Sequence, residues 1–389
     1  SERRQDLPHL AFLDQLFISF LNGVRRLFTG GFAHHKDRWT IGVEGRYTAR
    51  LEYRTVDPRP KNLTGDLQVK AGMGWSGLFN GTYEGGLSAG VRRYKQTNAL
   101  AFYNETSQPA VYHLTGLGMD YYRFRGSYTS TYYKGLGWNA TMELRPAAPR
   151  NGVYASLNYS FLAVEKIISD LNELPLTKLE LRHQGFELGY LRKGQACTWG
   201  VRMAEAYDER RGMENIFGSA QDNIYPQIAS GRQYRERRWN LSGALLCQYR
   251  PSGTAVYDLS LTQHYRHIRE SHVDPWREMS SAAQISTLSL KGMWQMKRWL
   301  LQTAARLDYA WNSRCSTTLN GNVNERMMAP VRHRCAFYGN NRQEAALRAE
   351  ADYAVNRHYS VFVAAEWNHA RYMKTEHNNL LRLSLGMEF

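Results

Sequence analysis

The sequence has no long hydrophobic run. None of its 389 residues belongs to a stretch of about 18 uncharged apolar residues, which is the length that a membrane-spanning helix needs. The mean hydropathy of −0.56 is also that of a soluble protein. A membrane β-barrel meets neither criterion, because half of every strand faces the lumen and is polar. These absences exclude a helical membrane protein and leave a barrel open.

Cysteine and proline are scarce, with 4 and 11 residues, whereas aromatic residues make up 13% of the chain. Together with 32 glycines, this composition favours a β protein with aromatic girdles. Acidic residues are outnumbered, and the net charge is +15. Such an excess suits anionic lipid or nucleic acid. Because there is no basic run of five residues and no recognisable binding module, we expect no nucleic-acid partner.

The N-terminus shows no signal peptide. Ser1-Glu2-Arg3-Arg4 lacks the apolar region and the small-residue cleavage site of a secretory leader. A secreted precursor that has already been processed would have this appearance.

The final residues alternate between apolar and polar side chains. Leu381, Leu383, Leu385 and Met387 are apolar, and Arg382 lies between them. This two-residue period is typical of a strand with one apolar face. The same period predicts fourteen strands, over residues 38–54, 65–77, 85–97, 131–146, 152–167, 178–191, 196–210, 233–249, 254–271, 285–296, 299–312, 343–355, 358–372 and 378–389.

Short connections alternate with longer ones along the chain. Turns such as "RPSG" and "VNRH" are short, and the longer connections are predicted at residues 55–64, 98–130, 168–177, 211–232, 272–284, 313–342 and 373–377. Short turns at one end and long loops at the other are typical of an outer-membrane barrel. We therefore predict an all-β, closed, antiparallel up-and-down barrel over residues 38–389. The C-terminus then lies at the periplasmic face, and the apolar side chains of the last strand face lipid.

The last nine residues, Leu381 to Phe389, resemble the C-terminal signature of outer-membrane β-barrel proteins. That resemblance implies that Phe389 belongs to an assembly signal that the barrel-assembly machinery recognises. In addition, "VDPRP" at 56–60 and "RRYK" at 92–95 resemble an uncharacterised Bacteroidota outer-membrane barrel family. This second resemblance implies a Gram-negative outer membrane and no activity.

Residues 1–37 do not follow the alternation. Their apolar residues recur at helical spacing between Leu10 and Phe28, and Gly30-Gly31 then ends the pattern. We predict a short helical or irregular segment that packs on the barrel's edge or mouth, or acts as a plug in the lumen. The alternative is that the segment is two strands, which would make sixteen.

Several short motifs do not suit the chemistry that they spell. Gly72 to Gly77 reads G-x-G-x-x-G and Gly86 to Gly90 reads G-x-S-x-G, but both lie in alternating strands rather than before a helix. His264 and His267 have opposite parity on one strand, so they cannot share a metal there. We expect no catalytic residue, no metal and no cofactor.

The four cysteines are compatible with an oxidising compartment. Cys315 and Cys335 are the two cysteines of one predicted long loop, and we expect them to form a disulfide. Cys197 and Cys247 lie near the same ends of neighbouring strands with the same parity, which is compatible with a second disulfide.

The inward parity carries many charges, and we expect these residues to line the lumen: Glu44, Arg46, Arg50, Lys70, Arg92, Glu143, Arg145, Arg202, Asp258, Arg266, Lys291, Arg306, Asp308, Arg348, Glu350, Asp352 and Arg382. They could form a salt-bridged network that fills a non-conducting lumen, or they could line a wet pore for small polar or anionic solutes.

The function that we predict first is that of a binding or partner subunit in an outer-membrane complex. Five tyrosines of the loop 98–130 would carry the contacts, namely Tyr103, Tyr112, Tyr121, Tyr122 and Tyr128. Expected partners are outer-membrane lipid and lipopolysaccharide, the barrel-assembly machinery during insertion, and another outer-membrane protein or lipoprotein. A solute channel is the alternative, and a membrane-embedded lipid hydrolase is the third hypothesis.

Overall fold

The computed structural model describes residues 22–55, 57, 59–102, 111–126, 130–147, 151–222, 224–321, 325–356, 359–372 and 376–388. The main sheet consists of β1 (Asn22–Lys36), β2 (Trp39–Tyr53), β3 (Arg59–Gly77), β4 (Tyr83–Ala101), β7 (Ser130–Pro146), β8 (Gly152–Ile168), β9 (Leu174–Lys193), β10 (Cys197–Phe217), β11 (Gln227–Ser252), β12 (Ala255–His272), β13 (Arg277–Met296), β14 (Trp299–Leu319), β15 (Arg342–Ala354), β16 (Ser360–Arg371) and β17 (His377–Glu388). The smaller elements are the strands β5 (Leu114–Gly116) and β6 (Met119–Asp120), the helices α2 (Leu78–Gly81) and α3 (Glu325–Gly339), and two 3₁₀ turns, Tyr122–Phe124 and Ser169–Leu171.

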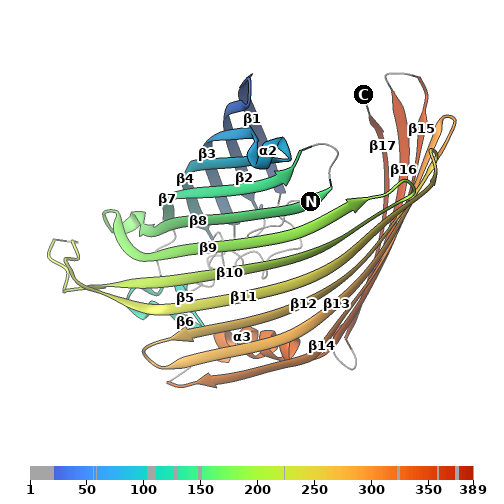
Figure 1. The fold of residues 1–389 in the computed structure, drawn as a ribbon. Helices are drawn as coiled ribbons and strands as arrows, with labels where there is room; N and C mark the ends of the chain where they lie inside the picture. The colour runs from blue at the N-terminus through green and yellow to red at the C-terminus, as the bar shows by residue number, and fades with distance from the viewer. Residues whose placement is uncertain are drawn as a thin grey trace.

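The main sheet follows chain order throughout. Its order is β1-β2-β3-β4-β7-β8-β9-β10-β11-β12-β13-β14-β15-β16-β17, and each neighbouring pair is antiparallel. The sheet curves continuously from β1 to β17, and α3 lies on the concave side of that curve (Figure 1). This is the up-and-down topology that the alternation predicted.

The two faces of the sheet differ in character, because directly paired residues share a face. The row Tyr190, Val201, Leu245, Leu261, Leu288 and Leu307 consists of successive cross-strand partners on one face. All six side chains are exposed, with Leu261 at 50%. We call this the outer face. On the opposite, inner face, a comparable row contains Asp258, Lys291, Arg348, Glu366 and Arg382.

Fifteen strands form the described sheet, so the prediction of fourteen is wrong. The additional strand is β1, which pairs with β2 from Asn22–Tyr53 to Lys36–Trp39. The helix predicted between Leu10 and Phe28 is therefore wrong for its second half, and the sheet begins well before residue 38. Residues 1–21 lie outside the described part of the chain.

The strands extend further than the sequence predicted at the end where the long connections lie. For example, β11 begins at Gln227 and β13 at Arg277, within segments that were predicted as loops. Connections of more than five residues remain at 102–129, 218–226 and 320–341. Beyond the apolar belt both faces of a strand are polar, so the alternation disappears from the sequence although the strand continues.

Buried side chains gather at this same end of the sheet. Three clusters of buried apolar residues are centred on Phe124, on Tyr133 and on Met328. None of the described helices has the length and apolarity to cross a bilayer.

Candidate functional site: two loops packed on the inner face

The first feature of the site is a plug, by which we mean residues 111–126 together with α3. Leu117 of the first segment and Met328 and Val331 of α3 pack with Met279 of β13. Met279 has the same strand parity as Lys291 and the opposite parity to the exposed Leu288 and Leu290. The plug therefore lies on the inner face, within the curve of the sheet (Figure 1).

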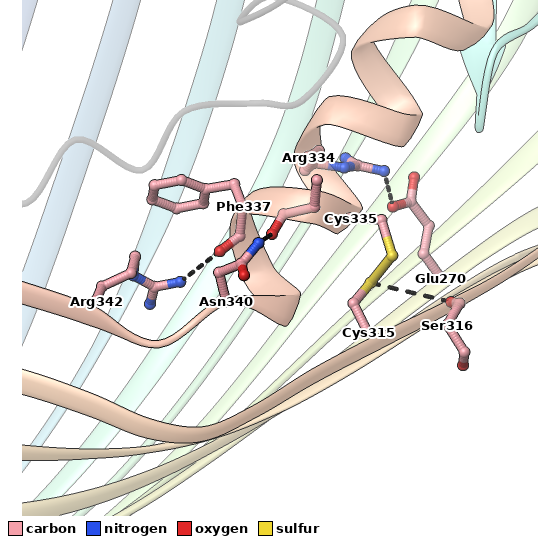
Figure 2. The surroundings of a disulfide bond; sticks show 9 residues. Glu270, Cys315, Ser316, Arg334, Cys335, Phe337, Asn340 and Arg342 are labelled. Carbon is pink, nitrogen blue, oxygen red and sulfur yellow. Dashed lines mark hydrogen bonds and ion pairs between the residues drawn. A yellow bond between two sulfur atoms is a disulfide. The ribbon is translucent and has the colours of Figure 1, made fainter. Parts of the chain in front are cut away.

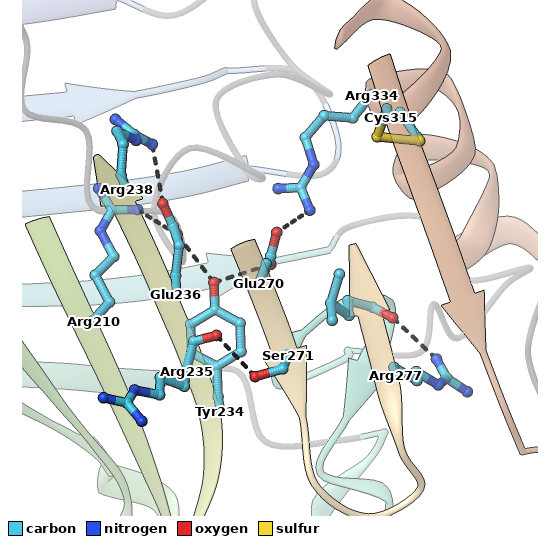
Figure 3. Close-up of polar contacts among 12 residues, drawn as sticks. Arg210, Tyr234, Arg235, Glu236, Arg238, Glu270, Ser271, Arg277, Cys315 and Arg334 are labelled. Atoms are coloured by element: carbon cyan, nitrogen blue, oxygen red, sulfur yellow. Dashed lines mark hydrogen bonds and ion pairs between the residues drawn. A yellow bond between two sulfur atoms is a disulfide. The ribbon is translucent and has the colours of Figure 1, made fainter. Parts of the chain in front are cut away.

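Arg277 holds the two plug segments together. Its side chain, labelled in Figure 3, is fully buried. Its Nη1 donates to the carbonyl of Leu117 at 3.0 Å and to Met328 Sδ of α3 at 3.5 Å, and its Nε donates to the carbonyl of Asn320 at 2.9 Å. The guanidinium at the start of β13 thus joins residues 111–126 to the chain that leads into α3. The sequence did not single out Arg277, because it fell in a predicted loop.

A disulfide ties α3 to the wall, as Figure 2 shows. Cys315 of β14 and Cys335 of α3 are bonded, with their Cα atoms 5.5 Å apart, so the predicted pairing is confirmed. Cys315 lies in a strand rather than in a loop, so the bond fixes the helix directly to the sheet. At the end of α3, Arg342 donates to the carbonyl of Phe337 at 3.0 Å and lies over its ring.

A buried ionic network lies between α3 and the strands beneath it (Figure 3). Arg334 of α3 forms an ion pair with Glu270 of β12, whose side chain is 5% exposed. The Tyr234 hydroxyl bridges two carboxylates, at 3.0 Å from Glu270 Oε1 and 3.1 Å from Glu236 Oε2. Arg210 of β10 and Arg238 of β11 pair with Glu236 at 3.2 and 3.1 Å. These contacts satisfy the buried charges, which would otherwise be costly.

Two glycines allow the β5–β6 hairpin to approach this network closely. A Cβ on Gly116 would lie 2.4 Å from the Tyr234 ring, and one on Gly118 would lie 2.6 Å from Met328 Sδ. Both glycines have positive φ angles, of 119° and 73°. Larger residues are therefore excluded by space and by backbone conformation alike.

The first plug segment is also anchored to β10. Phe124 packs against Phe217 and Tyr225 with ring centroids 5.7 and 5.2 Å apart. Arg123 donates to the carbonyls of Phe217 and Gly218. Packing and hydrogen bonds together hold residues 111–126 against the inner face.

The plug buries His113 of its first segment. Burial lowers the pKa of His113 to about 3, and the nearby Lys166 ammonium acts in the same direction. The side chain is 2% exposed, and its Nε2 has no hydrogen-bond partner among the described residues. His113 is therefore part of the packed interior of the plug.

The structure places all seventeen residues that were expected to line the lumen on the inner face, by strand register. Several pair as ions there, for example Arg92 with Asp66 at 2.8 Å and Arg202 with Glu187 at 2.6 Å. Arg266 meets the plug directly, with its guanidinium 5.2 Å from the centre of the Tyr338 ring.

A cavity of about 900 Å³ lies at the opposite end of the inner face, near the turns 37–38 and 78–82. Glu44, Lys70, Glu143 and Arg145 of the predicted set line it. Both glycine motifs, 72–77 and 86–90, also contribute to its wall, in β3 and β4. Neither motif precedes a helix of useful length, so neither forms a dinucleotide site or a nucleophile elbow.

The tyrosines that were expected to make loop contacts differ in exposure. Tyr122 is 79% exposed and Tyr112 is 39% exposed. Tyr121 instead faces inward, where its hydroxyl donates to the carbonyl of Asn215 and its ring stacks on Phe124. Tyr103 and Tyr128 lie outside the described residues, as does Phe389.

Cys197 and Cys247 lie close together without a bond. Their sulfur atoms are 3.5 Å apart, and both are free thiols in the structure, so the second disulfide is not formed there. His264 and His267 lie on opposite faces, paired with Ser242 and Trp239. No group of three or more potential metal ligands occurs in the part of the chain that the structure describes.

Comparison with known proteins agrees with this architecture. The model of a family of unknown function (DUF6850) matches residues 27–389. The chain belongs to this family. No curated protein matches the chain.

Two solved transporters share the fold. The copper transporter OprC has a TM-score of 0.50 at 10% identity, over 95% of this chain and 65% of its own. The ferric citrate transporter FecA, in its unliganded form, has a TM-score of 0.51 at 8% identity, over 94% of this chain and 55% of its own. The DUF6850 chain therefore spans less than two thirds of the length of either.

Proposed function

We propose that this DUF6850 protein is an outer-membrane β-barrel that acts as a binding or partner subunit and whose own loops obstruct its lumen. The observation that carries the proposal is the plug. A disulfide, the Arg277 bridge and the Glu270–Arg334 ion pair hold it on the inner face. A channel that must conduct would not need three independent attachments for segments that occupy its lumen.

The proposal includes a closed wall. An odd number of successive antiparallel strands leaves β1 and β17 running in the same direction, and they are not paired among the described residues. Antiparallel closure therefore requires one more strand between them, which gives the even number of bacterial barrels. In this arrangement the plug and the longer connections face outward from the cell, and the C-terminus of β17 faces the periplasm.

Exposed apolar side chains on the plug-side connections support a partner surface. Tyr122, Ile224, Val273 and Trp276 are all between 45% and 79% exposed. Aromatic residues of this kind are enriched at protein–protein interfaces. These four side chains lie beyond the strands, where lipid would not cover them.

We expect a double variant, Tyr122→Ala with Trp276→Ala, to lose at least tenfold of its affinity for an outer-membrane protein partner, once one has been isolated by co-purification with the wild type. Truncating two interface aromatics often costs 2 kcal/mol or more. The measurement is titration of the purified partner against each variant. Phe79→Ala is the matched control, because the 69% exposure of Phe79 lies between those of Trp276 and Tyr122, but Phe79 lies in α2 at the opposite end. Equal loss in the control would contradict a plug-side surface.

A solute channel is the second candidate, and the cavity of about 900 Å³ favours it. Its wall contains both carboxylates and basic side chains, which small polar solutes could use. The cavity lies at the end of the inner face away from the plug. A solute channel would therefore also need a path past the plug, whereas a partner subunit would not.

Planar-bilayer recordings separate the two candidates. We expect the wild-type barrel to show no stable conductance, because α3 and residues 111–126 occupy the inner face. Replacing residues 325–339 by a Gly-Ser linker, with Cys315→Ser to avoid a free thiol, is expected to produce open-channel steps. Cys315→Ser with Cys335→Ser, which keeps α3 and leaves neither thiol, is the control. Steady conductance of the wild type would favour the channel instead.

A further inference from the structure

A cluster of arginines lies on the outer face of the sheet, just beyond the apolar belt. Arg182, Glu209, Arg237, Arg269 and Ser280 are successive cross-strand partners from β9 to β13. The next row toward the plug end contains Glu180, Arg211, Arg235, Ser271 and Glu278. These two rows share a face with the exposed Leu245 and Leu261 and oppose the face that carries the plug.

The arginines converge on one buried carboxylate. Glu209, whose side chain is 5% exposed, lies 2.6 Å from Arg211 and 2.5 Å from Arg235, and Arg237 Nε lies 3.9 Å away. Two flanking pairs, Arg182 with Glu180 and Arg269 with Glu278, complete the group. Five arginines thus face three glutamates, which leaves two positive charges uncompensated.

The remaining charge is accessible from outside the sheet. The side chains of Arg235, Arg237 and Arg269 are 39%, 42% and 50% exposed. Figure 3 shows the Arg235 side chain projecting away from the Glu236–Glu270 network. Arg211 is less exposed, at 20%, and is held in place by its ion pair with Glu209.

The level of the cluster relative to lipid follows from the aromatic residues. On β11 the apolar part of the outer face extends from Tyr249 through Leu245 to Trp239. This length matches the ~9–11 residues that a tilted strand needs to cross a membrane. Trp239 and the neighbouring Tyr265 form one aromatic girdle, with ring centroids 5.8 Å apart. Arg237 is the next outward residue beyond that girdle. In the proposed membrane barrel, lipid headgroups lie at this depth.

From this placement we propose that the cluster Arg182, Arg211, Arg235, Arg237 and Arg269 binds the phosphomonoester headgroup of a glycolipid in the leaflet on the plug side. Planar guanidiniums match phosphate oxygens in pairs, which single ammonium groups do not. Glu209 positions three of them and offsets only one of their charges. The inference rests on the proposed membrane barrel, and it adds a specific lipid site on its outer wall.

The test uses folded, detergent-solubilised protein and mixed micelles that carry bis-phosphorylated lipid A, in EDTA so that no divalent cation bridges lipid to the glutamates. We expect Arg235→Gln with Arg237→Gln to weaken lipid A binding by about 10- to 30-fold, given ~1 kcal/mol for each basic residue near an anionic headgroup. Arg192→Gln is the matched control, since Arg192 lies on the same face of β9 at the opposite end. If the double variant does not fold, Arg269→Gln alone is measured, with an expected loss of about fivefold.

Each outcome decides the proposal. Loss in the double variant with unchanged binding in the control supports it. Unchanged lipid A binding, equal loss in the control, or equally tight binding of inorganic phosphate overturns it. Heat-modifiable migration on gels is recorded for every variant, because a chain that fails this assay contradicts the membrane barrel itself rather than the lipid site.

Discussion

Replacing Leu261 by arginine is expected to lower the free energy of unfolding of the barrel by about 2–4 kcal/mol. Leu261 is 50% exposed on the outer face of β12, and its direct partners Leu245 and Leu288 are also exposed. In the proposed membrane these side chains meet hydrocarbon, and a guanidinium there would lose its hydration. Urea unfolding of the protein in lipid vesicles measures the difference.

Ser260→Arg is the control for this substitution. Ser260 is the preceding residue on β12 and points to the inner face, between Leu246 and Ser289 in register and two residues from Asp258. An arginine there enters the polar lumen, so we expect a change of less than about 1 kcal/mol. A larger cost for Ser260→Arg than for Leu261→Arg would mean that the two faces are assigned in reverse.

The alternation in the sequence was sufficient to predict the wall of the sheet where one face is apolar. In that belt the outer-face positions are mostly apolar and exposed, so Leu259, Leu261 and their partners repeat with period two. The seventeen charged residues expected on the inner face all lie there by register. A shift of one residue in the alternation would have placed a whole strand's charged residues on the outer face.

The strand β1 was misread as helix for a simple geometric reason. Val24, Phe28 and Phe32 are spaced by four residues, and they are 53%, 60% and 69% exposed on one face. A spacing of four suits one face of a helix, but it is also an even number and therefore suits one face of a strand. Between them, Arg26 and Gly30 occupy the same face and hide the period of two.

The plug could not be predicted beyond its disulfide. Arg277 and Glu278 are polar on both faces of β13, because one meets Leu117 and Asn320 and the other meets Arg269. Such a stretch has neither the strand period nor the helix period, so the sequence alone favoured a loop. The packing of α3 on the sheet depends on contacts between residues that are far apart in the chain. The alternation within one strand carries no information about such contacts.

The disulfide itself gives the second large expected effect. Cys315→Ser with Cys335→Ser is expected to weaken the docking of α3 by about 3 kcal/mol, since Cys315 and Cys335 are 20 residues apart and cross-linking a loop of that size restricts the undocked chain. The strands should remain folded, because Cys315 is one residue of a long sheet pairing between β13 and β14. Protease cleavage between residues 320 and 341 should become faster, while heat-modifiable migration of the barrel stays unchanged.

Cys197→Ser with Cys247→Ser is the matched control, because it also removes two neighbouring sulfur atoms but from the outer face, away from the plug. We expect no change in cleavage of the plug in that variant. The remaining attachments of α3 are Arg334 to Glu270 and the packing of Met328 on Met279, and they should hold the helix for part of the time. Adding Arg334→Gln should therefore increase cleavage further. If cleavage is unchanged in all these variants, packing alone holds the plug. If the barrel no longer folds, the segment that contains Cys315 and Cys335 is needed to form the wall itself.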